Sequence, residues 1–108
     1  MGKLSDLHGD IHEIIMDYLV DKFNVSHKHY AAIHENDSVV IFCQGDRSAI
    51  IGEAIINEDA VIIIDFVNCL EDRIMHENRF SLYDRNSLEK ILWYMNIIAK
   101  VDILRHRK

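Results

Sequence analysis

The stretch from Val39 to Val67, VVIFCQGDRSAIIGEAIINEDAVIIIDFV, decides the fold that this sequence predicts. It contains three runs rich in Val, Ile and Phe, each ending at turn residues, and this pattern is typical of adjacent strands. We expect the strands at Val39–Gln44, Ala49–Ile56 and Ala60–Val67. Gly45-Asp46 has the pattern of a two-residue hairpin turn and Asn57-Glu58-Asp59 forms the next turn, so the strands should pair antiparallel.

Two helices are predicted on either side of these strands. Apolar residues recur every three or four positions over Ser5–Phe23, which indicates an amphipathic N-terminal helix. A C-terminal helix is predicted over Ser87–Leu104, because Asn86 followed by Glu89 is a start signal of the capping-box type. Shorter strands are expected at His29–His34 and Arg79–Tyr83. The sequence therefore predicts one α+β domain over residues 1–108: an N-terminal helix, about five strands in a mostly antiparallel meander, and a long C-terminal helix.

The central strands place apolar side chains on both faces of the predicted sheet. If the turns close without a bulge, Phe42 lies opposite Ala49 and Ile55 lies opposite Val61. One face is then wholly apolar and is predicted to be the core: Val39, Ile41, Cys43, Ile50, Gly52, Ala54, Ile56, Ile62, Ile64 and Phe66. The other face is also apolar and is interrupted only by Glu53 and Asp65. A sheet with one face in water would alternate apolar and polar residues, so either each face carries a helix or a partner covers the remainder.

The C-terminal helix carries more apolar surface than one sheet can bury. One stripe runs through Leu88, Ile91, Leu92, Met95, Ile98 and Ala99. A second stripe consists of Trp93, Ile97, Val101 and Leu104, with Tyr94 between the two. A helix that is apolar almost all round is buried on several sides. We therefore predict that Trp93, Tyr94, Ile97, Val101 and Leu104 form the contact between two copies of the chain.

The N-terminal helix carries an acidic stripe spaced four, three, four and four residues apart: Asp6, Asp10, Glu13, Asp17 and Asp21. This spacing places all of these carboxylates on one side of a helix, away from its apolar stripe. Like charges at that spacing weaken the helix by a few tenths of a kcal/mol per pair. The stripe is either a solvated helix face or a docking face for a basic protein, which includes the mimicry of a phosphate backbone.

The charge distribution argues against general nucleic-acid binding. The net charge is −6, with −10 over residues 1–72 and +4 over residues 73–108, whereas a nucleic-acid-binding protein needs a positive surface. The compact basic patch at Arg105, Arg107 and Lys108 is expected to complement the negative end of a helix dipole. A nucleic-acid contact through this patch is the alternative. No apolar run approaches the length of a membrane span and no leader pattern is present, so a cytoplasmic location is expected. The two cysteines, Cys43 and Cys69, are then reduced core thiols.

No motif in the sequence specifies an enzyme, a metal site or a cofactor. His8 and His12 are one helical turn apart, and His27 and His29 are close on an extended segment. However, HExxH and CxxC motifs are absent, so we expect no metal and no cofactor. On the assumed register Glu53 and Asp65 are diagonal neighbours. We expect them to mark a solvent-facing edge of that face or to pair with Arg47 or Arg79; the alternative is a small acid–base or metal-dependent enzyme that uses this pair and nearby histidines. No catalytic residue is assigned.

The sequence thus predicts an acidic, cytoplasmic protein-interaction module that acts as a homodimer and serves as an adaptor, chaperone or inhibitor. Its partner is expected to be a protein, with basic character to match the acidic helix.

Overall fold

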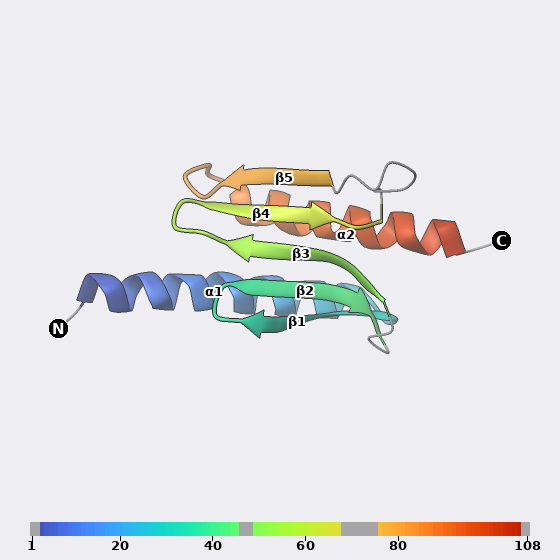
Figure 1. Ribbon diagram of the computed structural model, residues 1–108, viewed down its shortest axis with the longest axis horizontal. Coiled ribbons are helices and arrows are strands. Elements are labelled where there is room, and N and C mark those ends of the chain that lie inside the picture. The colour runs from blue at the N-terminus through green and yellow to red at the C-terminus, as the bar shows by residue number, and fades with distance from the viewer. Residues whose placement is uncertain (1–2, 46–48, 68–75, 107–108) are drawn as a thin grey trace.

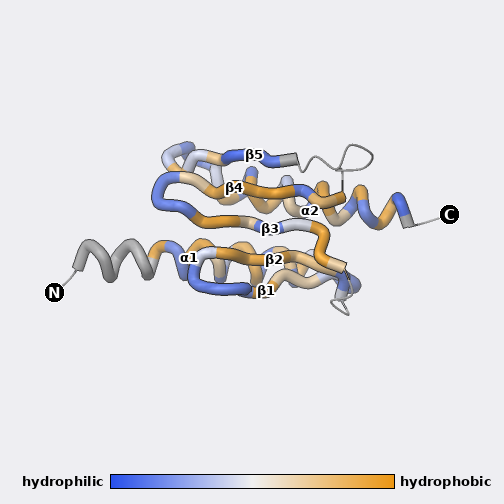
Figure 2. Tube along the Cα trace, in the orientation of Figure 1, coloured by the Kyte–Doolittle hydropathy of each residue, from blue (hydrophilic) through white to orange (hydrophobic). Residues whose placement is uncertain are grey.

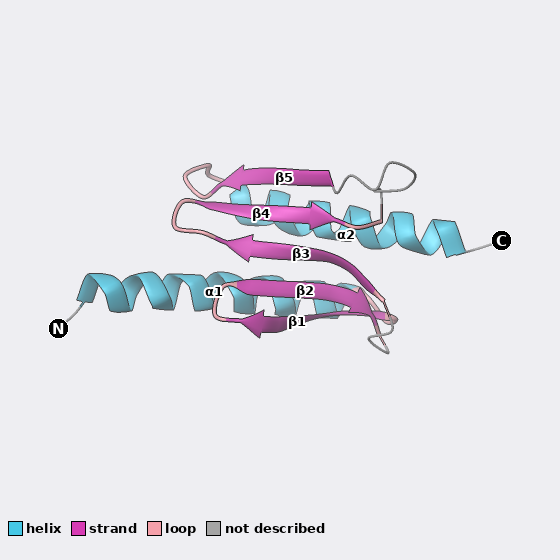
Figure 3. Cartoon of the chain, viewed as in Figure 1, coloured by secondary structure: helices cyan, strands magenta, loops and turns pink. Residues whose placement is uncertain are grey.

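The computed structural model describes the backbone of residues 3–45, 49–67 and 76–106, and the side chains of residues 11–45, 49–67 and 77–105. It confirms the predicted α+β architecture, in which a helix, a five-stranded antiparallel meander and a second helix follow one another (Figures 1 and 3). The elements are α1 (Lys3–Ser26), β1 (Tyr30–Asn36), β2 (Val39–Gln44), β3 (Ile50–Ile56), β4 (Ala60–Asp65), β5 (His76–Ser81) and α2 (Ser87–His106). The sheet order is β1-β2-β3-β4-β5.

Two predicted details of the strands are wrong. The register predicted from a two-residue turn at Gly45-Asp46 does not hold, because the backbone N–H of Gln44 donates to the carbonyl of Ala49 at 3.0 Å and Phe42 lies opposite Gly52. Asp46 itself lies outside the described residues. The last strand covers His76–Ser81, which is earlier than the predicted Arg79–Tyr83, because it continues the ladder along the whole of β4. The second predicted turn is confirmed, since the N–H of Asn57 donates to the carbonyl of Ala60 at 2.8 Å.

Both helices pack on the same face of the sheet and lie side by side (Figure 1). α1 packs mainly on β1, whereas α2 packs on β3, β4 and β5. The side chains that α1 buries are Ile15, Met16, Leu19 and Phe23, which lie on one side of the helix. The arrangement with one helix on each face is therefore not the one adopted, and the other face of the sheet carries neither helix.

Hydrogen bonds tie the end of α1 to the sheet and mark the beginning of α2. The Asn24 amide, near the end of α1, donates to the carbonyl of Ala32 at 3.2 Å and accepts from the N–H of Ala32 at 2.7 Å, which ties the helix to β1. α2 begins where the capping signal predicts, with the carbonyl of Asn86 accepting the N–H of Lys90 at 3.0 Å.

The pairing of β2 with β3 depends on a bulge and on Gly52. Phe42 lies opposite Gly52 and Val40 opposite Ala54, but Cys43 lies opposite Ile50, so the register shifts between Phe42 and Cys43. The Phe42 ring occupies the space above Gly52, because a Cβ atom built on Gly52 would lie 2.5 Å from the ring. This bulge and a one-residue difference in the β3–β4 register overturn the predicted cross-strand pairs.

The core face of the sheet consequently differs from the predicted one. Its buried members from the central strands are Val40, Phe42, Gly52, Ala54, Ile56, Val61, Ile63 and Asp65. The predicted core face mixed residues from both sides: its Val39, Ile41, Ile62 and Ile64 point away from the helices, because side chains alternate along each strand. The stripe of α2 that was predicted to face the core does so, with Ile91, Met95, Ile98 and Ala99 fully buried.

We predict that Gly52→Ala lowers the free energy of unfolding by about 1–3 kcal/mol, because the added methyl group overlaps the Phe42 ring and the ring must move. Urea unfolding followed by circular dichroism measures the change. In the double variant with Phe42→Leu, the two losses should be less than additive, because the smaller side chain relieves the overlap with the ring, although the methyl group still lies 2.9 Å from the carbonyl oxygen of Ile64. A Gly52→Ala variant as stable as the wild type would contradict this account of the register.

Candidate interaction surfaces

The sheet face opposite the helices is apolar, and we call it the open sheet face. Its six aliphatic side chains are Ile33, Val39, Ile41, Ile55, Ile62 and Ile64. All six are partly exposed, and none belongs to the hydrophobic core cluster or to the partly buried side chains packed against it. Figure 2 shows the same apolar character along β2, β3 and β4, with both helices behind them. No described element covers this face.

Glu53 and Asp65 lie on opposite faces of the sheet. Glu53 pairs with Ile64 on the open sheet face, whereas Asp65 pairs with Gly52 on the core face and is 1% exposed. The prediction that these carboxylates are neighbours on one face is therefore wrong, because it placed Ile55 opposite Val61, whereas Ile55 lies opposite Ile62 and the β3–β4 register differs by one residue. The acid–base or metal-dependent enzyme that we considered as an alternative loses the carboxylate pair on which it depended.

Asp65 is held by a hydrogen-bond network beneath α2. Its carboxylate accepts the N–H of Val67 at 2.9 Å and the hydroxyl of Tyr94 at 3.4 Å, and the Tyr94 oxygen accepts the amide of Asn78 at 2.6 Å. Burial, followed by the nearby Asp65 carboxylate, raises the pKa of Tyr94 above its ordinary value. Tyr94, which we predicted to contact a second copy, thus makes contacts within its own chain.

A second buried carboxylate joins the other half of α2 to the start of the sheet. Asp102 accepts the hydroxyl of Tyr30 at 2.5 Å and the amide of Gln44 at 3.2 Å. Beside it, a cavity of about 540 Å³ is lined by Lys28, His29, Tyr30, Gln44 and Gly45. Every buried side-chain nitrogen and oxygen among the described residues has a hydrogen-bond partner. We therefore interpret this network as a structural one that holds α2 against the sheet.

The outer side of α2 carries the second predicted stripe, and we call it the outer stripe: Trp93, Ile97, Val101 and Leu104. Trp93 is 63% exposed and Leu104 is 60% exposed, whereas Ile97 and Val101 are partly buried. At 100° per residue these positions lie opposite the side of α2 that holds Ile91 and Met95 in the core. The outer stripe is therefore accessible on the layer of helices.

The acidic stripe of α1 is accessible in the part whose side chains are described. Glu13, Asp17 and Asp21 are exposed, while the side chains of Asp6 and Asp10 lie outside the described residues. Asp17 lies 3.1 Å from the ring of His34 on β1. This contact uses one of the carboxylates and leaves Glu13 and Asp21 facing the solvent.

The histidines do not assemble into a metal site in the part of the chain that the structure describes. No group of three or more His, Cys, Asp or Glu side chains there is placed to hold an ion. His27 lies 2.5 Å from the Asn96 side chain, and the centroid of its ring lies 4.5 Å from that of the Phe23 ring, whereas His29 is exposed. The side chain of His8, the predicted neighbour of His12, lies outside the described residues.

The remaining predicted features are only partly placed. Arg105 is exposed, and its guanidinium donates to the carbonyl of Val67 at 2.5 Å, which ties α2 to the end of β4. Arg107, Lys108 and Cys69 lie outside the described residues. Cys43 is buried, and its thiol donates to the carbonyl of Ala31 at 3.6 Å. Across the described ranges, no helix combines the length and apolarity that crossing a membrane would require.

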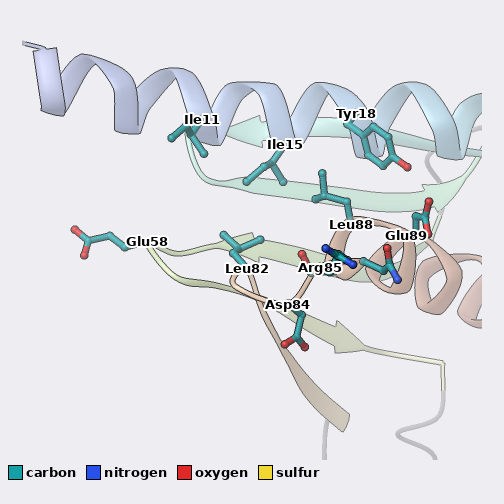
Figure 4. Close-up of a pocket in the computed structure, with 11 residues that line it drawn as sticks. Ile11, Ile15, Tyr18, Glu58, Leu82, Asp84, Arg85, Leu88 and Glu89 are labelled. Atoms are coloured by element: carbon teal, nitrogen blue, oxygen red, sulfur yellow. The ribbon is translucent and has the colours of Figure 1, made fainter.

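A groove that sequence reasoning missed separates α1 from the start of α2 (Figure 4). Its volume is about 510 Å³, and its apolar walls come from Ile11, Ile15, Tyr18, Leu82 and Leu88. Charged side chains on the rim come from the β3–β4 turn, from the loop before α2 and from the first turn of α2: Glu58, Asp84, Arg85 and Glu89. The sequence shows the apolar residues of α1 but not that the β5–α2 loop lies opposite them.

We predict that Tyr30→Phe lowers the free energy of unfolding by about 1–2 kcal/mol near neutral pH, because buried Asp102 loses a donor. Burial and the hydrogen bond to Asp102 raise the pKa of Tyr30 well above its ordinary value. The folded state thus favours the protonated phenol, and this stability is present below about pH 10 and is lost as the pH rises further. Urea unfolding at about pH 8 and pH 11 should show a shallower decline for Tyr30→Phe than for the wild type. Equal declines would refute the assignment, and Tyr83→Phe, at a tyrosine that is 83% exposed, is the matched control.

We predict that Glu13→Gln combined with Asp21→Asn stabilises the protein by about 0.5 kcal/mol at low salt, because each carboxylate is one turn from Asp17. The gain should shrink at about 1 M salt, since screening weakens the repulsion. Glu35→Gln combined with Glu58→Gln, two exposed sites outside α1, serves as the control for the same change in net charge. Thermal unfolding in both buffers measures the effect. A variant that is no more stable than the wild type at low salt would contradict the repulsion between these carboxylates.

Comparisons with protein-family models, with curated protein sequences and with solved structures find no match to this chain. A function therefore has to be inferred from the chain's own surfaces. Three of these surfaces differ in chemistry: the acidic stripe of α1, the outer stripe of α2 and the open sheet face.

Proposed function

We propose that this chain is a cytoplasmic protein-interaction module, of the adaptor, chaperone or inhibitor kind, that acts as a homodimer through the outer stripe of α2. The observation that carries the proposal is the exposure of Trp93 and Leu104 on one side of a helix whose other side is fully buried. Exposed apolar patches of this kind usually mark protein contacts. Tryptophan in particular is enriched at the centre of such contacts.

The energetic gain from covering the outer stripe is substantial. Burial of a large apolar side chain contributes about 1.5–3 kcal/mol relative to its exposed state. Trp93 and Leu104 each retain more than half of their exposure, and Ile97 between them is partly exposed. A two-fold axis across the stripe would bury all of these side chains twice, once from each copy.

The surroundings of the outer stripe favour a second copy over the basic target as the molecule that covers it. Lys90 and Lys100 are exposed and lie three or four residues from members of the stripe, so they border it. A polar rim around an apolar centre is the usual anatomy of an interface. The two lysines repel a basic protein, which leaves the acidic stripe of α1 as the surface for that partner.

The acidic stripe supports a basic partner as the target of the module. Glu13 and Asp21 face solvent, and their like-charge repulsion with Asp17 lowers the stability of α1. Such a surface attracts a basic protein at long range and increases its association rate. It does not attract nucleic acid, whose phosphates carry the same sign of charge.

The test is the solution mass of the wild type and of the Trp93→Glu, Ile97→Glu double variant, measured by light scattering at micromolar concentrations. We expect a dimer for the wild type and a folded monomer for the variant, because two carboxylates in the contact would lose their hydration. Circular dichroism confirms that the variant is folded.

The matched control is the Val25→Glu, Tyr83→Glu double variant. It introduces the same two charges at apolar side chains that are 85% and 83% exposed and lie outside the outer stripe. This control should remain a dimer. A monomeric wild type, or a control that dissociates like the test variant, would rule out the outer stripe as the dimer contact.

A further inference from the structure

The open sheet face is a second uncovered surface, and it lies on the opposite side of the molecule from the outer stripe (Figure 1). Its six aliphatic side chains surround one carboxylate, that of Glu53 on the central strand β3. Ile41 and Ile64 lie directly beside Glu53 on the two neighbouring strands. Because β3 is the third of the five strands, the carboxylate of Glu53 lies near the centre of the apolar surface.

Glu53 has no partner of its own in the structure. It makes no ion pair and no side-chain hydrogen bond with any residue of the described chain. The other charged side chains on this face are those of Glu77 and Arg79 on β5, and Arg79 lies 3.8 Å from the Asp59 carboxylate. The open sheet face is therefore apolar with a net negative charge.

A second copy of the chain is a poor match for this face. A two-fold axis through the middle of the face would place the two Glu53 carboxylates near each other between two apolar sheets. Removal of an unpaired carboxylate from water costs several kcal/mol, and repulsion between the two adds to that cost. A contact with another protein that offers a cation at this position removes the penalty and forms a pair of opposite charge.

We infer that the open sheet face binds a segment of a partner protein whose side chains are aliphatic except for one lysine or arginine that pairs with Glu53. The acidic character of the whole chain, with a net charge of −6, favours the same basic partner. The apolar side chains provide most of the binding energy, and Glu53 provides selectivity. The inference rests on the proposed role as a protein-interaction module but does not depend on the dimer contact of α2.

The test uses a phage-displayed library of random 16-residue peptides, selected in parallel on the wild type and on Glu53→Lys. Peptides enriched on the wild type should combine aliphatic residues with a single Lys or Arg, and peptides enriched on Glu53→Lys should carry Asp or Glu instead. A synthetic peptide from the wild-type selection should bind Glu53→Lys about tenfold more weakly, as expected for a lost ion pair within an apolar contact. The control is Glu89→Lys, which makes the same charge change at an exposed side chain of α2, away from the open sheet face. It should alter the affinity for the peptide by less than about twofold.

Ile62→Asp is the second variant, because it removes apolar contact from the face without changing Glu53. It should abolish peptide binding while leaving the circular dichroism spectrum and the solution mass unchanged. Enriched peptides without a charge preference, peptides that bind Ile62→Asp as well as the wild type, or a library that yields no binder would each overturn the inference. A loss of dimer mass in Ile62→Asp would also overturn it, since a second copy would then cover the face.

The peptide experiment and the dimer experiment test the two proposals independently of each other. If the Trp93→Glu, Ile97→Glu variant still binds the selected peptides, the open sheet face acts independently of the outer stripe. A monomeric wild type that shows the charge-dependent selection would refute the homodimer and leave this inference intact.

Discussion

The Phe42 ring lies against the backbone of Gly52 on the neighbouring strand, and this close approach holds β2 and β3 in their register. Only a residue without a Cβ atom leaves room for the ring. The register then decides the side of the sheet on which each apolar side chain lies, because a shift by one residue exchanges the faces of a strand. The core between the helices and the sheet, and the open sheet face on the opposite side, both follow from that contact.

Two buried carboxylates orient α2 on this sheet. Asp65 on β4 accepts a hydrogen bond from Tyr94 on α2, and Asp102 on α2 accepts hydrogen bonds from Tyr30 and Gln44 in the sheet. Aliphatic packing alone allows a helix to rotate about its axis at a modest cost, whereas a buried polar group without its partner costs about 1–3 kcal/mol. The two networks thus specify the side of α2 that faces the sheet and leave the outer stripe on the opposite side.

The molecule is consequently asymmetric across its thickness. The layer of helices presents carboxylates on α1 beside an apolar stripe with lysines on α2, whereas the sheet presents a flat aliphatic surface with a carboxylate at its centre. A protein with two such faces can contact a second copy through one and a different partner through the other. Selectivity between the two comes from charge, because unpaired carboxylates disfavour contacts with an acidic surface.

The sequence by itself determined the elements, because their signals are local: apolar spacing in the helices, aliphatic runs in the strands and the capping pattern at Asn86. It also separated the outer stripe of α2 from the core stripe, since helical spacing distinguishes the two sides. Only the tertiary structure decided the sheet faces, because strands that are apolar at every position contain no period-two signal, and the bulge at Phe42 has no local signature in the sequence. For the same reason the separation of Glu53 from Asp65, the placement of both helices on one face and the groove beside Leu82 all depend on contacts between residues far apart in the chain.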